Sequence, residues 1–177
     1  MGARMEIIKA EASAYEATRR FYHSLIDEMG QAGNVVTWVK DVYPSPEFLQ
    51  ASAQAGTLYL GMEDDEIAAA MVLNHEAGEG YRGAPWNVKA NDEEVLVIHA
   101  LGVHPRFGGK GLGAQMTEGA IRIARDADMK AVRLDVQRGN EPARRIYVRC
   151  GFKSIAEVSM YYENTGLATF ELFEFAL

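Results

Sequence analysis

The chain has 177 residues, of which 48% are hydrophobic and 24% are charged, and its formal net charge is −7. This composition excludes a disordered protein, a collagen-like fibre and a disulfide scaffold, and the length fits a single domain over residues 1–177. The acidic balance argues against nucleic-acid binding, and no apolar run reaches the roughly 18 residues that a membrane span needs. The N-terminal residues lack the apolar stretch of a signal peptide, and the one cysteine, Cys150, fits a reducing compartment, so we expect a cytoplasmic protein.

Hydrophobic spacing predicts the first three elements. Residues 5–9 are expected to form a short strand, and residues 12–29 an amphipathic helix that Gly30 ends. Ser45 is placed to cap a second helix, which Gly56 would terminate.

A hairpin and a buried strand follow. Residues 57–62 and 67–74 predict two strands around a charged turn, and the polar loop over residues 75–94 is long enough to be functional. Residues 95–103 are apolar on both faces, as expected of a central strand that is covered on both sides. Residues 104–113 form a turn with four glycines.

The second half alternates helix and strand, which predicts an α/β layer. Helices are expected at 112–127 and 141–150, the latter capped by Asn140, and strands at 131–136, 154–161 and 169–175.

The glycine turn joins the buried strand to a helix. Glycines allow positive φ and the close approach of a ligand, and the unpaired amides at a helix start attract a phosphate or pyrophosphate. A Walker A loop needs Ser or Thr where Gly111 stands, and a dinucleotide fingerprint needs a third glycine where Met116 stands, so both are excluded. A tight structural connection remains the alternative to a phosphate loop.

A second motif lies downstream of the turn. Asn140, Ala143, Tyr147, Gly151 and Phe152 match the pattern Asn-x-x-Ala-x-x-Leu-Tyr-x-x-x-Gly-Phe, with Ile146 in place of Leu. Gly111 and Gly113 match the end of an Arg/Gln-x-x-Gly-x-Gly/Ala loop, whose leading position is occupied by Gly108. In this order, and after a strand, the two motifs resemble those of the GNAT superfamily of N-acetyltransferases over residues 95–152.

The resemblance implies a mixed central sheet of six to seven strands, flanked by helices, in which the two central parallel strands splay apart to receive acetyl-CoA as cosubstrate. The pantetheine arm would pair with the first of these strands, and the amides of the turn would hold the pyrophosphate. No metal is implied. The implied cofactor-binding residues are Leu101, Val103, Gly108, Gly109, Lys110, Gly111, Leu112, Gly113, Asn140, Ala143 and Arg149.

Acetyl transfer to a primary amine needs a base for the ammonium, a donor for the oxyanion and an acid for the leaving thiolate. By resemblance Tyr147 stands at the acid position, although an aromatic residue packed in the core fits the pattern too. His99 lies among apolar strand residues and is a candidate base, and a hydrogen-bonded core histidine is the alternative. Glu94 is a second candidate for the base.

Aromatic side chains hold amines by cation–π contact, so the acceptor site is expected to use Trp38, Tyr43, Tyr81 and Trp86, with Tyr161 or Tyr162. Core packing explains the same residues. A small-molecule amine, a peptide N-terminus, a lysine and an aminoglycoside all stay open as acceptors, as does a homodimer. Two other functions share the fold: a noncatalytic acyl-CoA sensor and a transferase of longer acyl groups.

Overall fold

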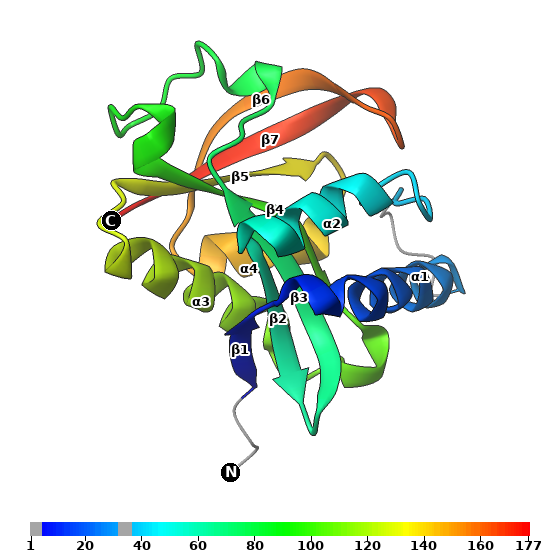
Figure 1. Cartoon of the computed structure of the whole chain (residues 1–177). Coiled ribbons are helices and arrows are strands. Elements are labelled where there is room, and N and C mark those ends of the chain that lie inside the picture. The colour runs from blue at the N-terminus through cyan, green and yellow to red at the C-terminus, as the bar shows by residue number, and fades with distance from the viewer. Residues whose placement is uncertain (1–4, 32–36) are drawn as a thin grey trace. The chain divides into compact units, whose positions relative to one another are not determined.

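The computed structural model describes residues 5–31 and 37–177, and these residues form a mixed seven-stranded sheet with four α-helices (Figure 1). The strand order is β1-β2-β3-β4-β5-β7-β6. The strands are β1 (Glu6–Lys9), β2 (Leu58–Glu63), β3 (Glu66–Asn74), β4 (Val95–Val103), β5 (Ala131–Gln137), β6 (Lys153–Tyr162) and β7 (Gly166–Ala176). The helices are α1 (Tyr15–Gln31), α2 (Pro46–Ala55), α3 (Leu112–Asp126) and α4 (Glu141–Arg149). The predicted fold class is confirmed.

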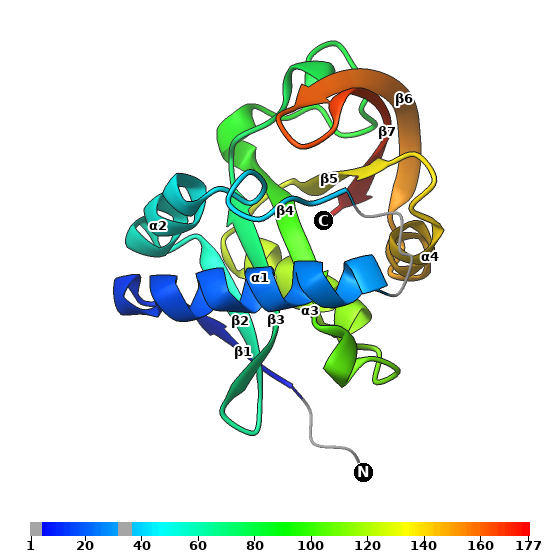
Figure 2. The ribbon, with the colours of Figure 1, turned by 90° about the vertical axis from the view of Figure 1, so that its right-hand side faces the viewer.

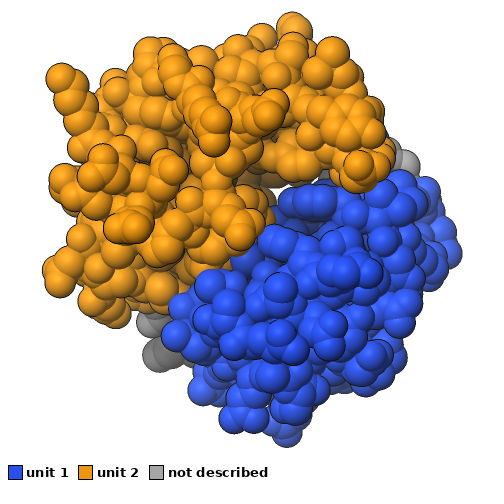
Figure 3. Space-filling view, turned by 45° about the horizontal axis from the view of Figure 1, so that its top comes forward, with its two compact units in different colours: residues 1–72, 100–116 blue, residues 73–99, 117–177 orange. Residues whose placement is uncertain are grey.

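The chain divides into two compact units, which Figure 3 colours separately. The first comprises the described residues up to Val72 together with Ala100–Met116, and the second comprises Leu73–His99 and Thr117–Leu177. The division passes through β3, β4 and α3. The assignment of residues 1–177 to one domain therefore stays a prediction.

In the first unit, α1 and α2 pack on one face of the antiparallel strands β1, β2 and β3 (Figure 1). Tyr22 and Leu25 of α1, Leu49 of α2, Leu58 of β2 and Val72 of β3 are buried together in this core. These side chains recur at helical spacing in α1 and at alternate positions in the strands, which is why the sequence pattern predicted both kinds of element.

Local chemistry sets the ends of the helices α1 and α2. Ser45 caps α2 as predicted, because its hydroxyl accepts a hydrogen bond from the Phe48 amide at 3.1 Å. Gly56 ends the same helix in the left-handed conformation at φ 70°. α1 instead continues past Gly30 to Gln31, since a single glycine weakens a helix without removing its hydrogen bonds.

In the second unit, β5 pairs antiparallel with β7, and β7 pairs with β6 in a long hairpin (Figure 2). One face of this sheet carries aromatic residues that pack with α4: the rings of Tyr147 and Phe173 lie 6.4 Å apart. The opposite face has a core that includes Val97, Ala131 and Leu172. No helix in the described ranges is long and apolar enough to cross a membrane.

The central parallel strands β4 and β5 pair over only the first part of β4. Within the described residues, β4 and β5 pair only from Val95↔Ala131 to Val97↔Arg133. In contrast, β5 stays paired with β7 along its whole length, as far as Gln137. The predicted splay of the two central strands is confirmed, and it begins directly after Val97.

Candidate active site

The glycine turn follows β4 and begins with a short 3₁₀ segment, Pro105–Phe107. Gly109 and Gly111 have φ values of 77° and 71°, which is the left-handed region that favours glycine. The amide of Gly108 donates to the carbonyl of Pro105 at 2.8 Å. Of the predicted phosphate-binding amides, the one of Gly108 is thus already engaged in the turn.

The amides of residues 109–112 have no hydrogen-bond acceptor within the part of the chain that the structure describes. They stand at the start of α3, where the helix dipole adds partial positive charge. The basic side chains of the turn are already paired, Arg106 with Glu66 and Lys110 with Glu63 at 2.7 Å. The main chain, rather than a free side chain, therefore provides the anion-binding groups of this turn.

Ala100 interrupts the extended course of β4 with a φ of 49°, which is unusual for a residue with a Cβ atom. Its carbonyl accepts a hydrogen bond from the hydroxyl of buried Tyr22 at 2.6 Å. Farther along β4, a Cβ atom added to Gly102 would lie 3.0 Å from Leu25 and 3.2 Å from Trp38. The predicted cofactor residues Leu101 and Val103 flank Gly102, so Leu25 of α1 and Trp38 pack closely against this end of β4.

Tyr147 lies in α4 and is buried, with 7% of its surface exposed. Its ring packs against Phe152 and Phe173, with centroid distances of 5.9 and 6.4 Å. Burial, reinforced by the charge of Asp135, raises the pKa of the Tyr147 hydroxyl, which is protonated at neutral pH. A protonated phenol is the state that an acid needs.

The other predicted residues of α4 are placed at its two ends. Asn140 is the N-cap, and its side-chain oxygen accepts a hydrogen bond from the Ala143 amide at 3.3 Å. Arg149 is exposed in the last turn. Contacts of these residues with a cofactor stay a prediction.

His99 is half-buried in β4, and its Nε2 lies 2.8 Å from Oδ1 of Asn74. Because an amide oxygen only accepts, the ring donates at this nitrogen. Burial lowers the pKa of His99 to about 4, so the ring is neutral at pH 7. Glu94, the second candidate base, is fixed at the start of β4 by Lys130 at 2.7 Å.

Four of the predicted acceptor residues form two ring pairs, one in each unit. Trp38 and Tyr43 pack together in the first unit with ring centroids 5.8 Å apart. Tyr81 and Trp86 pack together in the second unit at 5.4 Å, and the Trp86 indole nitrogen donates to the Tyr81 carbonyl at 2.9 Å. Each pair belongs to the core of its own unit, and a role in acceptor binding stays a prediction.

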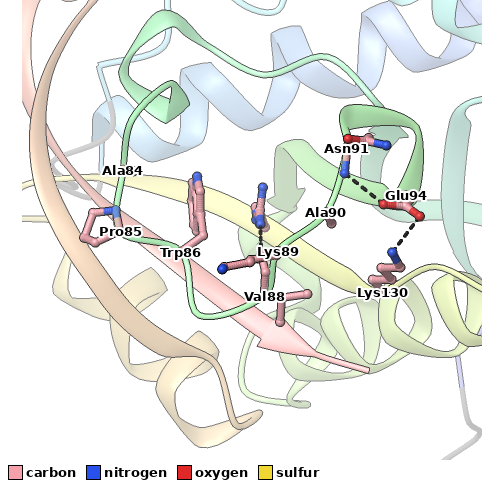
Figure 4. Close-up of a pocket in the computed structure, with 10 residues that line it drawn as sticks. Ala84, Pro85, Trp86, Val88, Lys89, Ala90, Asn91, Glu94 and Lys130 are labelled. Atoms are coloured by element: carbon pink, nitrogen blue, oxygen red, sulfur yellow. Dashed lines mark hydrogen bonds and ion pairs between the residues drawn. The ribbon is translucent and has the colours of Figure 1, made fainter.

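A pocket of about 590 Å³ lies on the second unit, under the loop that precedes β4 (Figure 4). Trp86 lines it, and the guanidinium of Arg133 lies 4.2 Å from the Trp86 ring centroid. Glu94 and Lys130 place the pocket at the amino ends of β4 and β5. None of the predicted cofactor residues lines it.

Sequence reasoning missed Asp135 of β5. Both of its carboxylate oxygens accept from the Tyr162 hydroxyl, at 2.8 and 3.1 Å. Burial raises the pKa of Asp135 to about 6, despite the opposing effect of this hydrogen bond. The available signal was an acidic residue that alternates with the apolar residues Val132, Leu134 and Val136 along the strand. The described residues contain no group of three or more side chains suited to hold a metal.

The family model for the acetyltransferase (GNAT) family matches residues 13–152, and the chain belongs to this family. Acetyl-CoA is the cosubstrate of the family. The predicted family is confirmed.

Curated relatives match parts of the chain. A mycothiol acetyltransferase of Beutenbergia cavernae is 34% identical over 50% of this chain and 30% of its own length. The uncharacterized N-acetyltransferase YesJ of Bacillus subtilis is 27% identical over 64% of this chain and 63% of its own. A streptothricin acetyltransferase of Escherichia coli is 29% identical over 51% of this chain and 48% of its own. The chain thus spans less than two thirds of each of these relatives.

Solved structures match nearly the whole chain. A GNAT-family acetyltransferase of Listeria monocytogenes has a TM-score of 0.75 at 19% identity, covering 98% of this chain and 95% of its own. The putative acetyltransferase yncA of Salmonella typhimurium, solved with its cofactor acetyl-CoA, has a TM-score of 0.71 at 16% identity, covering 99% of this chain and 95% of its own. At these identities the likeness supports the fold.

Proposed function

We propose that this protein transfers an acetyl group from acetyl-CoA to a primary amine. The observation that carries the proposal is the early end of β4–β5 pairing at Val97↔Arg133, followed in the chain by a turn whose amides at residues 109–112 lack acceptors among the described residues. A strand that loses its neighbour has main-chain groups left to pair with a ligand. Amides at a helix start suit a pyrophosphate. Acetyl-CoA supplies both an extended amide-containing arm and a pyrophosphate.

In this proposal the pantetheine arm pairs with the backbone at Leu101 and Val103, and the amides of Gly109, Lys110, Gly111 and Leu112 hold the pyrophosphate. Gly108 shapes the turn through its bond to Pro105, and Gly113 lies in the first turn of α3. Asn140, Ala143 and Arg149 contribute from the amino-terminal and carboxyl-terminal ends of α4.

The chemistry is a direct attack of the amine on the thioester. Loss of a proton from the ammonium frees the nitrogen lone pair, because an alkylammonium with a pKa of about 10.4 is otherwise almost wholly protonated at neutral pH. A backbone amide near Leu101 would stabilise the oxyanion. The tetrahedral intermediate expels the thiolate, to which Tyr147 gives its proton. The sequence made His99 a candidate base for the first step, and in the structure this ring is a neutral hydrogen-bond donor to Asn74.

The acceptor is proposed to be the primary amine of a small molecule or peptide. The relatives named for mycothiol and streptothricin support a small molecule. Binding by Trp38 with Tyr43, or by Tyr81 with Trp86, a cytoplasmic location and a homodimer remain predictions.

Thiol release from acetyl-CoA, measured with tyramine, spermidine, lysine and kanamycin as acceptors, tests the proposal. We expect release with at least one amine, and calorimetry should show binding of coenzyme A. The variant Tyr147→Phe should bind coenzyme A like the wild type, and its turnover number should fall about 100-fold or more. Binding without release from any amine would favour the noncatalytic sensor, and wild-type turnover by Tyr147→Phe would remove the acid assignment.

A further inference from the structure

The strand register relates Asp135 to His99. Two steps past the last pair, Val97↔Arg133, the register would reach His99 on β4 and Asp135 on β5. Alternate residues of a strand share a face, so Asp135 lies on the same face of β5 as Ala131 and Arg133. Ala131 and Val97 belong to the hydrophobic core on this face of the sheet. The carboxylate therefore stands on β5 just beyond the point where the central strands stop pairing.

Asp135 differs from the other shielded carboxylates of this sheet. Glu174 pairs with Arg133 at 2.9 Å, and Glu171 pairs with Arg144 at 2.8 Å. Asp135 has the Tyr162 hydroxyl as its partner, and across the described chain no basic side chain forms an ion pair with it. The residue as a whole is partly exposed to solvent. A shielded carboxylate with a neutral partner and access from solvent favours a cationic ligand.

The groups around Asp135 are suited to amine chemistry. Tyr162 of β6 donates to the carboxylate, and its ring packs edge-on against Phe170 at 5.0 Å. The charge of Asp135 acts on the hydroxyl of Tyr147 in α4. On its own strand the nearest charged side chain of the same face is Arg133, which is committed to Glu174. By register, the neutral ring of His99 is a further titratable neighbour.

We propose that Asp135, oriented by Tyr162, binds the ammonium group of the acceptor and receives its proton. This inference rests on the proposed acetyl transfer and narrows its acceptors to amines that are cationic at neutral pH. Electrostatic pairing draws the ammonium to the carboxylate, and the proton then moves from nitrogen to Asp135.

The freed nitrogen attacks the thioester carbon, a C–N bond forms, and the carbonyl electron pair moves to oxygen. The intermediate collapses, the C–S bond breaks, and the sulfur leaves with its electron pair and takes the Tyr147 proton. The nitrogen releases its second proton to the Tyr147 phenolate. Asp135 then loses the first proton to solvent. The carboxylate is mainly ionised at neutral pH, since its pKa of about 6 lies below that pH.

The test uses the amine with the fastest thiol release from the panel above and the variants Asp135→Asn, Tyr162→Phe, His99→Gln and Asp128→Asn. Asp135→Asn keeps an acceptor for the Tyr162 hydroxyl, and Asp128 is an exposed control. We expect Asp135→Asn to bind coenzyme A like the wild type while kcat/KM for the amine falls about 100-fold or more. The value of kcat/KM should fall less in Tyr162→Phe and should stay unchanged in Asp128→Asn.

The pH profile separates a chemical role from a structural one. In the wild type, kcat/KM should fall on the acidic side with a midpoint near the pKa of Asp135, about 6. This limb should persist in His99→Gln and vanish from the residual rate of Asp135→Asn. If the wild type is active and kcat/KM of Asp135→Asn lies within threefold of it, the role of Asp135 is overturned and the proposed function stands. The same holds if the variant keeps the acidic limb. If the wild type fails to release thiol with every amine of the panel, the proposed function is overturned as well.

Discussion

Replacing Asp135 by asparagine should change how stability depends on pH. The unfolded carboxyl has a pKa of about 3.9, whereas burial raises the pKa of Asp135 in the folded chain to about 6. Between these values the folded chain holds a proton that the unfolded chain has released. The free energy of unfolding therefore falls as the pH rises from about 4 to about 6, and above that range the loss is constant.

The magnitude follows from the difference of about two pH units, which corresponds to about 3 kcal/mol at 1.36 kcal/mol per unit. The asparagine side chain cannot ionise, so we expect the Asp135→Asn variant to be more stable than the wild type by up to about 3 kcal/mol at pH 8, relative to its difference at pH 4. His99 contributes a slope of the opposite sign, because burial lowers its pKa to about 4. The difference between variant and wild type isolates Asp135, since His99 is present in both.

Urea unfolding at a series of pH values measures this difference. The control Asp128→Asn alters an exposed aspartate whose φ of 54° suits asparagine equally well. Its stability difference from the wild type should not follow the same pH course. An equal advantage of Asp135→Asn at pH 4 and pH 8 would show that burial of the charge costs nothing, contrary to the raised pKa of Asp135.

Three further changes test the packing that supports the site. Glu174→Gln leaves the buried Arg133 without its ion-pair partner at 2.9 Å, and should lower the free energy of unfolding by about 3–5 kcal/mol in urea. Tyr22→Phe leaves the Ala100 carbonyl without its donor at 2.6 Å, which should cost about 1–3 kcal/mol and weaken calorimetric binding of coenzyme A. Ser45→Ala removes the cap of α2 and should cost about 1 kcal/mol by the same urea measurement.

The controls for these changes come from the same chain. Tyr161→Phe alters a tyrosine that is 64% exposed, so its free energy of unfolding should match the wild type. An equal loss in Tyr161→Phe and Tyr22→Phe would contradict the role of the buried hydrogen bond. Glu157→Gln removes the acid of an exposed pair with Arg138 at 3.9 Å, and a cost as large as that of Glu174→Gln would contradict the importance of burial.

Much of the fold was predictable from the sequence because its signals are local. Ser45 and Asn140 cap helices within three residues of themselves, and the predicted caps are both present. The β2–β3 hairpin follows from alternating apolar residues, although its turn is tighter than predicted, with Asp64 and Asp65 at positive φ. The two motifs of the second half were sufficient to predict the family, which the family model over residues 13–152 confirms.

The chemistry of individual residues depended on tertiary contacts. Tyr22 meets Ala100 across 78 positions, His99 meets Asn74 across 25, and Asp135 meets Tyr162 across 27. No periodic pattern encodes such pairs, because each depends on which strands and helices become neighbours. Removal from water then shifts the pKa of each titratable group, and this shift is a property of its surroundings rather than of its residue type. The sequence by itself determined the family, the main elements and the glycine turn, while only the tertiary structure made His99 a neutral donor and Asp135 a shielded carboxylate with a neutral partner.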